Sequence, residues 1–236
     1  MAQDPSPDPS NQDELANSRG SDWGEFVKTA IYAIVIALVI RTLFFEPFNI
    51  PSGSMKPTLL VGDYLFVSKP AYGYSRHSFP LSLAPIEGRI WGSKPKRGDV
   101  AVFKLPSNDR VDFIKRVIGL PGDTVQVIGG EVHINGEPIP RTYKGRLEIR
   151  TRDGLKKTMQ VYRETLGNGR SYFVYEERPD APLDNTRPFQ VPDGHFFVMG
   201  DNRDNSQDSR VQSLVGYVPF ENFVGRAELI FFSTNG

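Results

Sequence analysis

The sequence of 236 residues contains no cysteine. Disulfide bonds, a thiol nucleophile and cysteine-ligated metals are therefore excluded. Histidine is scarce as well: the three copies are His77, His133 and His195, and neither an HExxH motif nor a pair at metal-ligand spacing occurs. The sequence thus predicts no metal site and no other cofactor.

An excess of charge of either sign is also missing. Lysine and arginine number 28, and so do aspartate and glutamate, which gives a formal net charge of zero. Residues 1–25 hold six acidic side chains and one arginine, a balance of −5, so the remainder carries +5. Neither value is large enough to indicate a surface that binds nucleic acid.

One long apolar run is present, at residues 26–45. At about 1.5 Å per helical residue, a run of this length is enough to cross the hydrocarbon core of a bilayer. Its two charged side chains before the final Glu-Pro-Phe segment, Lys28 and Arg41, lie near the ends, where long side chains can reach the interface. The run therefore predicts a single transmembrane helix.

A buried core helix or a cleaved secretory signal peptide is the alternative for this run. A signal peptide starts nearer the N-terminus, behind a basic region, and ends at a small-residue cleavage site. Here the run ends in RTLFFEPF and follows residues 1–25, which are rich in Pro, Ser, Asp and Asn and are expected to form a disordered acidic tail. The sequence favours an uncleaved anchor, whose orientation the flanking charges do not decide.

After Pro51 the sequence predicts strands. Short β-branched or aromatic segments such as YLFVSK, DVAVFKL, DFIKRVIGL, HFFVMG and AELIFFS are bounded by Gly, Pro or Asp, and IGGEVHINGEPI has the turns of a hairpin. We expect a mainly β protein, with an antiparallel sheet domain over residues 46–236. The more charged residues 141–190 are expected to be an inserted β-rich subdomain, and residues 72–96 a long irregular loop.

Ser54, in PSGSMKPT, is a candidate nucleophile that needs a base. None of the three histidines lies in a nucleophile-elbow context, and GxSxG is absent. Lysine serves as a base only where burial disfavours its charge, and Lys115 in DFIKRVIGL has apolar neighbours. Lys56 precedes a proline and is expected to be solvated. The SxxK pattern of penicillin-binding enzymes does not fit Ser54-Met55-Lys56.

Four segments together resemble the bacterial type I signal peptidases, also called leader peptidases. They are RTLFFEPFNIPSGSMKPTLLVGD, KRGDV (96–100), DFIKRVIGLPGD (112–123) and MGDNRDNSQDSR (199–210), in the order of that family. The resemblance covers roughly residues 40–130 and 190–236. Any one segment alone is weak, but the four in order are specific.

This resemblance implies a role for several residues. Ser54 is similar in position to the nucleophile and Lys115 to the general base, while Ser206 would hydrogen-bond and orient the lysine. Ser52 would supply the oxyanion-hole hydroxyl together with the Ser54 N–H. Two acids and two arginines would hold the site together as ion pairs: Asp201, Asp208, Arg116 and Arg210. Four bulky apolar residues would line shallow substrate pockets: Phe48, Ile50, Met55 and Ile114.

The implied activity is serine endopeptidase cleavage of signal peptides after small residues at −1 and −3, by a Ser-Lys dyad. The implied partners are secreted preproteins and membrane lipid, close to the secretion translocon. The implied location is the bacterial inner membrane, with the N-terminus cytoplasmic and the peptidase domain outside. Two alternatives remain: a Ser-Lys hydrolase of narrower purpose (a self-cleaving regulator or a peptidase for one conjugation or pilus substrate), and a non-enzymatic envelope adaptor.

Overall fold

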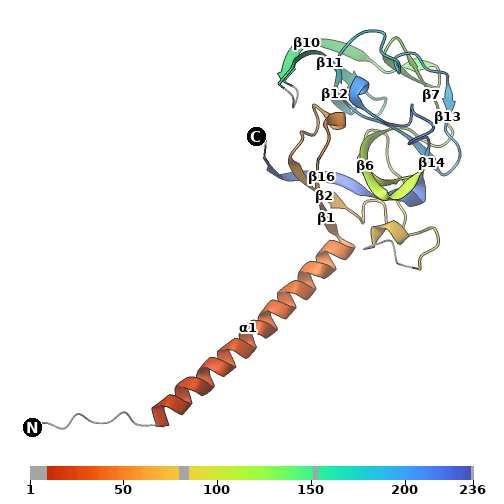
Figure 1. Cartoon of the computed structure of the whole chain (residues 1–236). Helices are drawn as coiled ribbons and strands as arrows, with labels where there is room; N and C mark the ends of the chain where they lie inside the picture. Colours follow the sequence, from red (N-terminus) through yellow and green to blue (C-terminus); the bar gives the residue numbers. More distant parts are fainter. Residues whose placement is uncertain (1–9, 80–84, 151–153, 235–236) are drawn as a thin grey trace, which may run out of the picture. The chain divides into compact units, whose positions relative to one another are not determined.

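The computed structural model describes residues 10–79, 85–150 and 154–234. The chain divides into two compact units, of which the first ends at Thr42 and the second begins at Leu43. The first unit is helical and the second is built from strands (Figure 1). Each is described by itself below.

The helix of the first unit, α1, runs from Ser10 to Leu43. Its segment Trp23–Leu43 is long and apolar enough to span a membrane, and none of its apolar window is buried in the structure. The N-terminal tail that was expected to be disordered is helical from Ser10 onward, and its residues 1–9 lie outside the described residues. The reason is that no proline interrupts the chain between Pro9 and Pro47, so the helix propagates beyond its apolar part.

A seven-stranded sheet forms the centre of the second unit, and every neighbouring pair in it is antiparallel. In spatial order its strands are β1 (Phe45–Asn49), β2 (Asp63–Ser68), β16 (Phe223–Ser233), β5 (Val100–Leu105), β6 (Asn108–Gly119), β14 (His195–Met199) and β15 (Val218–Pro219). The last long strand of the chain is therefore inserted between two early ones. This arrangement confirms the predicted mainly β, antiparallel fold.

Three smaller sheets surround it. Their strands are β13 (Phe189–Gln190), β7 (Thr124–Ile128), β8 (Glu131–Ile134) and β9 (Glu137–Pro138); then β10 (Arg141–Arg150), β11 (Lys156–Thr165) and β12 (Ser171–Glu176); and β3 (Tyr74–Ser75) with β4 (Arg89–Ile90). We call β10–β12 the inserted sheet; it occupies most of the predicted 141–190 insertion, whereas β13 pairs with β7 instead. The hairpin predicted around EVHING is present as β7–β8.

The 72–96 segment is less irregular than expected in its described part. β3 and β4 pair within it, and Arg89 joins them to the main sheet by donating hydrogen bonds to the carbonyl oxygens of Gly73 and of Phe223 in β16. One arginine thus satisfies backbone acceptors from two distant segments, a role that local composition does not reveal.

The buried apolar side chains form three clusters. The one nearest the candidate nucleophile arises because alternate residues of a strand share a face, as do Leu65 and Val67 of β2. Its fully buried members are Ile50, Met55, Leu59, Leu65, Val67, Val102 and Val224. The turn that carries Ser54 therefore packs against this buried apolar cluster.

The C-terminal half of β16 is exposed although it is apolar. Leu229 is 62% exposed and Phe232 56%, with Ile230 and Phe231 between them also exposed. The Phe231 ring stacks on Phe66 of β2 at 4.3 Å between centroids. Such a contiguous group of exposed apolar side chains is uncommon on the surface of a soluble monomer.

Candidate active site

Ser54 lies in a short 3-10 turn, Gly53–Met55, that follows β1. We call residues 52–55 the Ser54 turn. Ser54 is buried, and Asn202 fixes the turn twice: its backbone N–H donates to the Ser54 carbonyl at 3.0 Å, and its side-chain amide donates to the Gly53 carbonyl at 3.0 Å. The main chain of the serine is thus tied to a segment about 150 residues later in the sequence.

Lys115 reaches the serine from β6. Its Nζ donates hydrogen bonds of 2.8 Å to Ser54 Oγ and to the Ile114 carbonyl, and it lies 5.0 Å from the centre of the Phe113 ring. Only 3% of Lys115 is exposed. The amine therefore has few polar partners and almost no water.

This burial has a direct effect on the lysine. Desolvation lowers the pKa of Lys115 from 10.5 to about 8, against the opposing influence of the carboxylates of Asp208 and Asp201. An ammonium that loses its hydration gives up its proton more readily. At slightly alkaline pH a large share of Lys115 is therefore a neutral amine, able to accept a proton from the hydroxyl that it contacts.

Two other serines lie beside the pair. Ser52 is exposed, and its hydroxyl oxygen is 3.4 Å from Ser54 Oγ. Ser206 is buried, and its hydroxyl makes no hydrogen bond to the described residues, so the bond to Lys115 that the family resemblance implies is not formed.

Two buried ion pairs flank the site, as the resemblance implied for these four residues. Arg116 binds Asp201 through two hydrogen bonds, Nε–Oδ1 at 2.8 Å and Nη2–Oδ2 at 2.6 Å. Arg210 binds Asp208 in the same way, both at 2.8 Å. Burial alone raises the pKa of Asp208, but Arg210 outweighs it and the net pKa lies below the ordinary value. Such forked pairs fix geometry as well as charge.

An open cavity of about 550 Å³ adjoins Ser54 and Lys115. Its lining comprises Pro51, Ser52, Ser54, Val111, Asp112, Phe113, Ile114, Lys115, Asp204, Asn205, Ser206 and Gln207. Of the four residues predicted to line substrate pockets, Ile114 does so. Ile50 and Met55 are buried in the core cluster beneath the Ser54 turn instead, and Phe48, half-buried in β1, packs against the same cluster.

The alternative bases lie elsewhere. His195 Nδ1 is 2.9 Å from the Asp193 carbonyl, His133 Nδ1 is 3.5 Å from the Gly136 carbonyl, and His77 lies against Arg76. None of them hydrogen-bonds Ser54. Lys56 is half-buried, and its amine has no hydrogen bond or ion pair with the described part of the chain. Among the described residues, Lys115 is therefore the one basic side chain that hydrogen-bonds the Ser54 hydroxyl.

Sequence reasoning missed two residues of the site. One is Asn202, whose two bonds to the Ser54 turn are given above. The other is Gly200: a Cβ there would lie 2.2 Å from Ser206 Oγ and 2.6 Å from the Ser54 carbonyl oxygen, so a larger side chain does not fit. A glycine and an asparagine next to two acids in MGDNRD were the available signal, since both often mark close backbone contacts.

The sequence of this chain is similar to those of known proteins. The family model described as "Signal peptidase, peptidase S26" matches residues 23–232. A protein named signal peptidase I from Rickettsia conorii is 45% identical over 221 residues, which are 90% of this chain and 79% of that one. Another of that name, from Rickettsia prowazekii, is 45% identical over 232 residues, 95% of this chain and 85% of that one.

A solved structure of a signal peptidase I from Enterococcus faecalis is also similar. The match has 27% sequence identity and covers 57% of this chain and 97% of that one. Its TM-score of 0.32 is too low to add to the description of the fold.

Proposed function

Because the chain belongs to the signal peptidase family, peptidase S26, we propose that Ser54 and Lys115 are the dyad with which it removes N-terminal signal peptides from translocated preproteins. It is a serine peptidase of that family. The observation that carries the proposed dyad is the 2.8 Å hydrogen bond between a buried lysine and a serine at the edge of an open cavity.

The proposed reaction has two steps. Neutral Lys115 takes the Ser54 proton as Oγ bonds to the scissile carbonyl carbon, and it returns that proton to the leaving nitrogen as the peptide bond breaks. Lys115 then takes a proton from water as the water oxygen attacks the ester carbon, and it returns this proton to Ser54 Oγ as the ester bond breaks. Ser52 Oγ and the Ser54 N–H are proposed to stabilise the oxyanion in both steps, which is worth a few kcal/mol per donor.

Substrate choice is proposed to come from the cavity walls. Phe113 and Ile114 lie beside Lys115 on β6 and limit the space near the reacting carbonyl. Small side chains at −1 and −3 fit such a wall, whereas a bulky side chain at either position would collide with it. Preproteins with an Ala-x-Ala sequence before the cut are the expected substrates.

Attachment to a membrane is proposed to use two features. The apolar segment Trp23–Leu43 would span the bilayer, with the N-terminus in the cytoplasm and residues 46–236 on the other side, close to the translocon that delivers the precursors. The exposed apolar end of β16 would rest on lipid. Added protease should then digest the β domain in spheroplasts, and protection of that domain would overturn the orientation.

The proposed dyad and substrate class are tested together by cleavage of a panel of unrelated precursors with Ala-x-Ala sites. Wild-type protein should cleave most of them at that site, and Ser54→Ala should cleave none above background while folding normally. Activity of Ser54→Ala would exclude this serine as nucleophile. Cleavage of a single precursor would favour a dedicated processing peptidase, and inactivity of the wild type would favour a non-enzymatic adaptor.

A further inference from the structure

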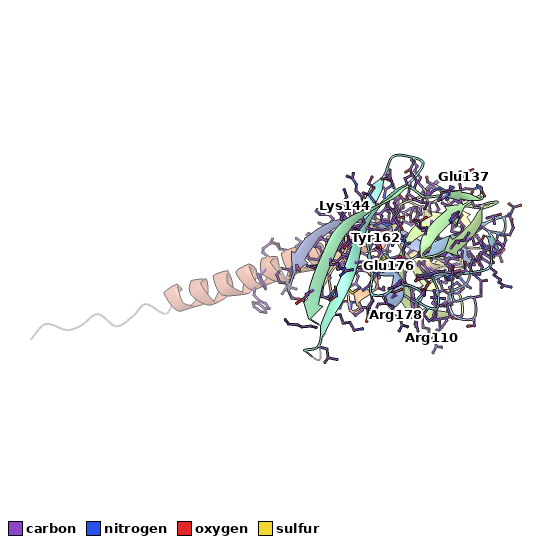
Figure 2. All side chains as sticks on the ribbon, turned by 90° about the horizontal axis from the view of Figure 1, so that it is seen from above. Arg110, Glu137, Lys144, Tyr162, Glu176 and Arg178 are labelled. Carbon is purple, nitrogen blue, oxygen red and sulfur yellow. The ribbon has the colours of Figure 1, made fainter. Side chains whose placement is uncertain are left out.

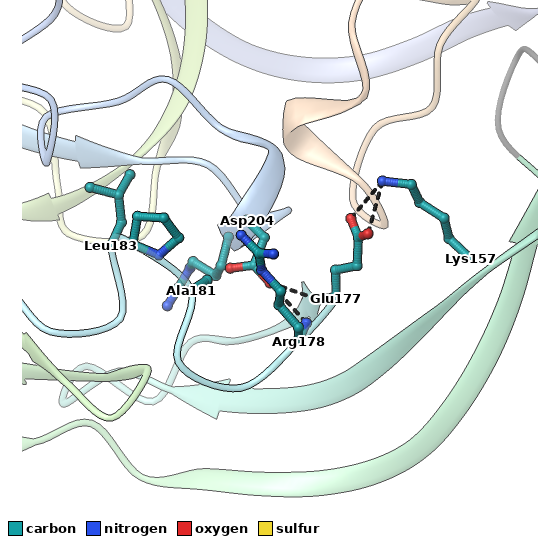
Figure 3. Close-up of a pocket in the computed structure, with 8 residues that line it drawn as sticks. Lys157, Glu177, Arg178, Ala181, Leu183 and Asp204 are labelled. Atoms are coloured by element: carbon teal, nitrogen blue, oxygen red, sulfur yellow. Dashed lines mark hydrogen bonds and ion pairs between the residues drawn. The ribbon is translucent and has the colours of Figure 1, made fainter.

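The inserted sheet contacts the segment that carries Ser206, residues 200–210, which we call the 200–210 loop. At one contact the backbone of β12 is hydrogen-bonded to this loop: the Tyr175 N–H donates to the Asp201 carbonyl at 2.9 Å. At a second, the Asp204 carboxylate accepts hydrogen bonds from the N–H groups of Glu177 and Arg178, at 2.7 and 3.1 Å (Figure 3). The two segments are therefore attached along an edge.

The third contact is a fully buried ion pair. Arg203 of the loop and Glu164 of β11 have side chains only 2% and 1% exposed, and Arg203 Nη2 lies 2.6 Å from Glu164 Oε2. Tyr172 of β12 donates its hydroxyl to the same carboxylate at 2.8 Å. A buried guanidinium needs such a partner, because its desolvation is otherwise uncompensated.

The other side of Arg203 points to the proposed catalytic residues. Its Nε donates to the Gly200 carbonyl at 3.1 Å, and its own carbonyl accepts a 2.7 Å hydrogen bond from Arg210. Gly200 packs against Ser206 and the Ser54 carbonyl so closely that a Cβ would not fit. Any displacement of Arg203 is therefore passed to Ser206 and to the Ser54 turn.

We propose that Glu164 and Arg203 are positioning residues for catalysis: through this pair the inserted sheet sets the position of the 200–210 loop against Ser54. The proposal rests on the function proposed above and assigns a role to the insertion. Neither residue lines the 550 Å³ cavity, so both act through the loop and not on the substrate.

The measurement is kcat and KM for precursor cleavage by Glu164→Gln, in the full-length protein. The amide keeps the shape of the carboxylate but leaves Arg203 without its countercharge. We expect kcat to fall at least about tenfold with KM within about threefold, since small displacements of reacting groups are costly while the cavity lining is unchanged. Arg203→Lys should show the same pattern, because a lysine cannot reach both Glu164 and the Gly200 carbonyl in fork geometry.

The inserted sheet offers a matched control. Arg141 and Glu176 form a second buried pair, also 2.6 Å apart, in which Arg141 stacks over the Tyr162 ring at 3.6 Å. Figure 2 labels Tyr162 and Glu176 on this sheet. The charge of Arg203 acts to lower the pKa of Glu176, but no hydrogen bond joins the side chains of this pair to the 200–210 loop in the described residues. Glu176→Gln removes the same charge, so it should lower the thermal midpoint similarly but leave kcat within about twofold.

The outcomes separate this proposal from the proposed function. If the wild type cleaves precursors and Ser54→Ala does not, the function stands and the comparison of the two glutamates decides. A kcat of Glu164→Gln within twofold of wild type overturns the positioning role. So does an equal kcat loss in Glu176→Gln, or a loss that the unfolded fraction in a thermal melt accounts for. If the wild type is inactive, the proposed function itself fails.

Discussion

The Lys115 amine donates a 2.8 Å hydrogen bond to the Ser54 hydroxyl, although 61 residues separate the two in the sequence. Lys115 lies in β6, a strand inside the central sheet, and Ser54 lies in the turn that follows the edge strand β1. Burial of the amine makes this contact chemically useful, because it lowers the lysine pKa to about 8. A solvated lysine in the same place would hold its proton at neutral pH.

The first prediction concerns the pH dependence of cleavage. Since Lys115 must be neutral to accept a proton and its pKa is about 8, kcat/KM should rise about tenfold per pH unit below that value and level off above it. Lys115→Arg should be inactive because arginine stays charged. Lys56→Ala is the control and should keep the wild-type profile. A rising limb near pH 10.5, or normal cleavage by Lys115→Arg, would exclude the buried lysine as the base, and His195 would be the next candidate.

The second prediction concerns stability. Burial places the folded-state pKa of Lys115 near 8, below the 10.5 of the unfolded chain, so the charged form is disfavoured in the folded state at pH 7. A depression of this size costs roughly 3 kcal/mol below pH 8, and the cost fades as pH rises from 8 to 10.5. Lys115→Met should therefore be inactive yet more stable by roughly 1–3 kcal/mol at pH 7.

Urea unfolding at several pH values measures this effect. The stability advantage of Lys115→Met should shrink as the pH approaches 10. Lys56→Met replaces a half-buried lysine with no described partner and should gain little. A Lys115→Met protein less stable than wild type at pH 7 would contradict the buried, weakly solvated amine.

The third prediction uses two glycines. Gly200→Ala would place a methyl group 2.2 Å from Ser206 Oγ, so the loop or the Ser54 turn must move, and activity should fall by about 100-fold or more. Gly167→Ala is the control, because no atom lies within 4 Å of its Cβ position. It should retain wild-type cleavage. A Gly200→Ala enzyme with normal kcat would show that the close contact is dispensable.

The fourth prediction compares two buried asparagines. Asn202→Ala removes the donor to the Gly53 carbonyl and should lower kcat by about 10-fold or more, with a stability loss of about 1 kcal/mol. Asn222 donates in the same way to the Lys104 carbonyl, at 2.9 Å, away from the site. Asn222→Ala should therefore cost similar stability while leaving kcat unchanged. Similar kcat losses in both variants would remove Asn202 from the site.

The sequence predicted those features that depend on local pattern. The fold class followed from strand periodicity and turn residues, and the family followed from four segments in order; both are confirmed. Ser54 was proposed from its turn and Lys115 from its apolar strand neighbours. The structure brings these two together, while their chemical roles remain predictions until variants are assayed.

The sequence could not predict contacts between residues that lie far apart in the chain. The bond from Asn202 to Gly53 spans 149 positions, and the Glu164–Arg203 pair spans 39, so no local pattern reports either. Ile50 and Met55 were expected to line a pocket because they flank the serine. They are buried because the chain around Ser54 packs onto the core. The direction in which their side chains point depends on contacts with β2 and β5, which are distant in the sequence.

The place of β16 in the sheet bears on how the protein matures. This strand follows the other strands of the central sheet in the sequence, yet it lies between β2 and β5. Ser54 lies in the turn between β1 and β2, and Lys115 lies in β6, next to β5. The sheet cannot close around the serine and lysine until residue 223 and those after it have been synthesised. A chain truncated before β16 should therefore be inert, because the strand that joins the two halves of the sheet is missing.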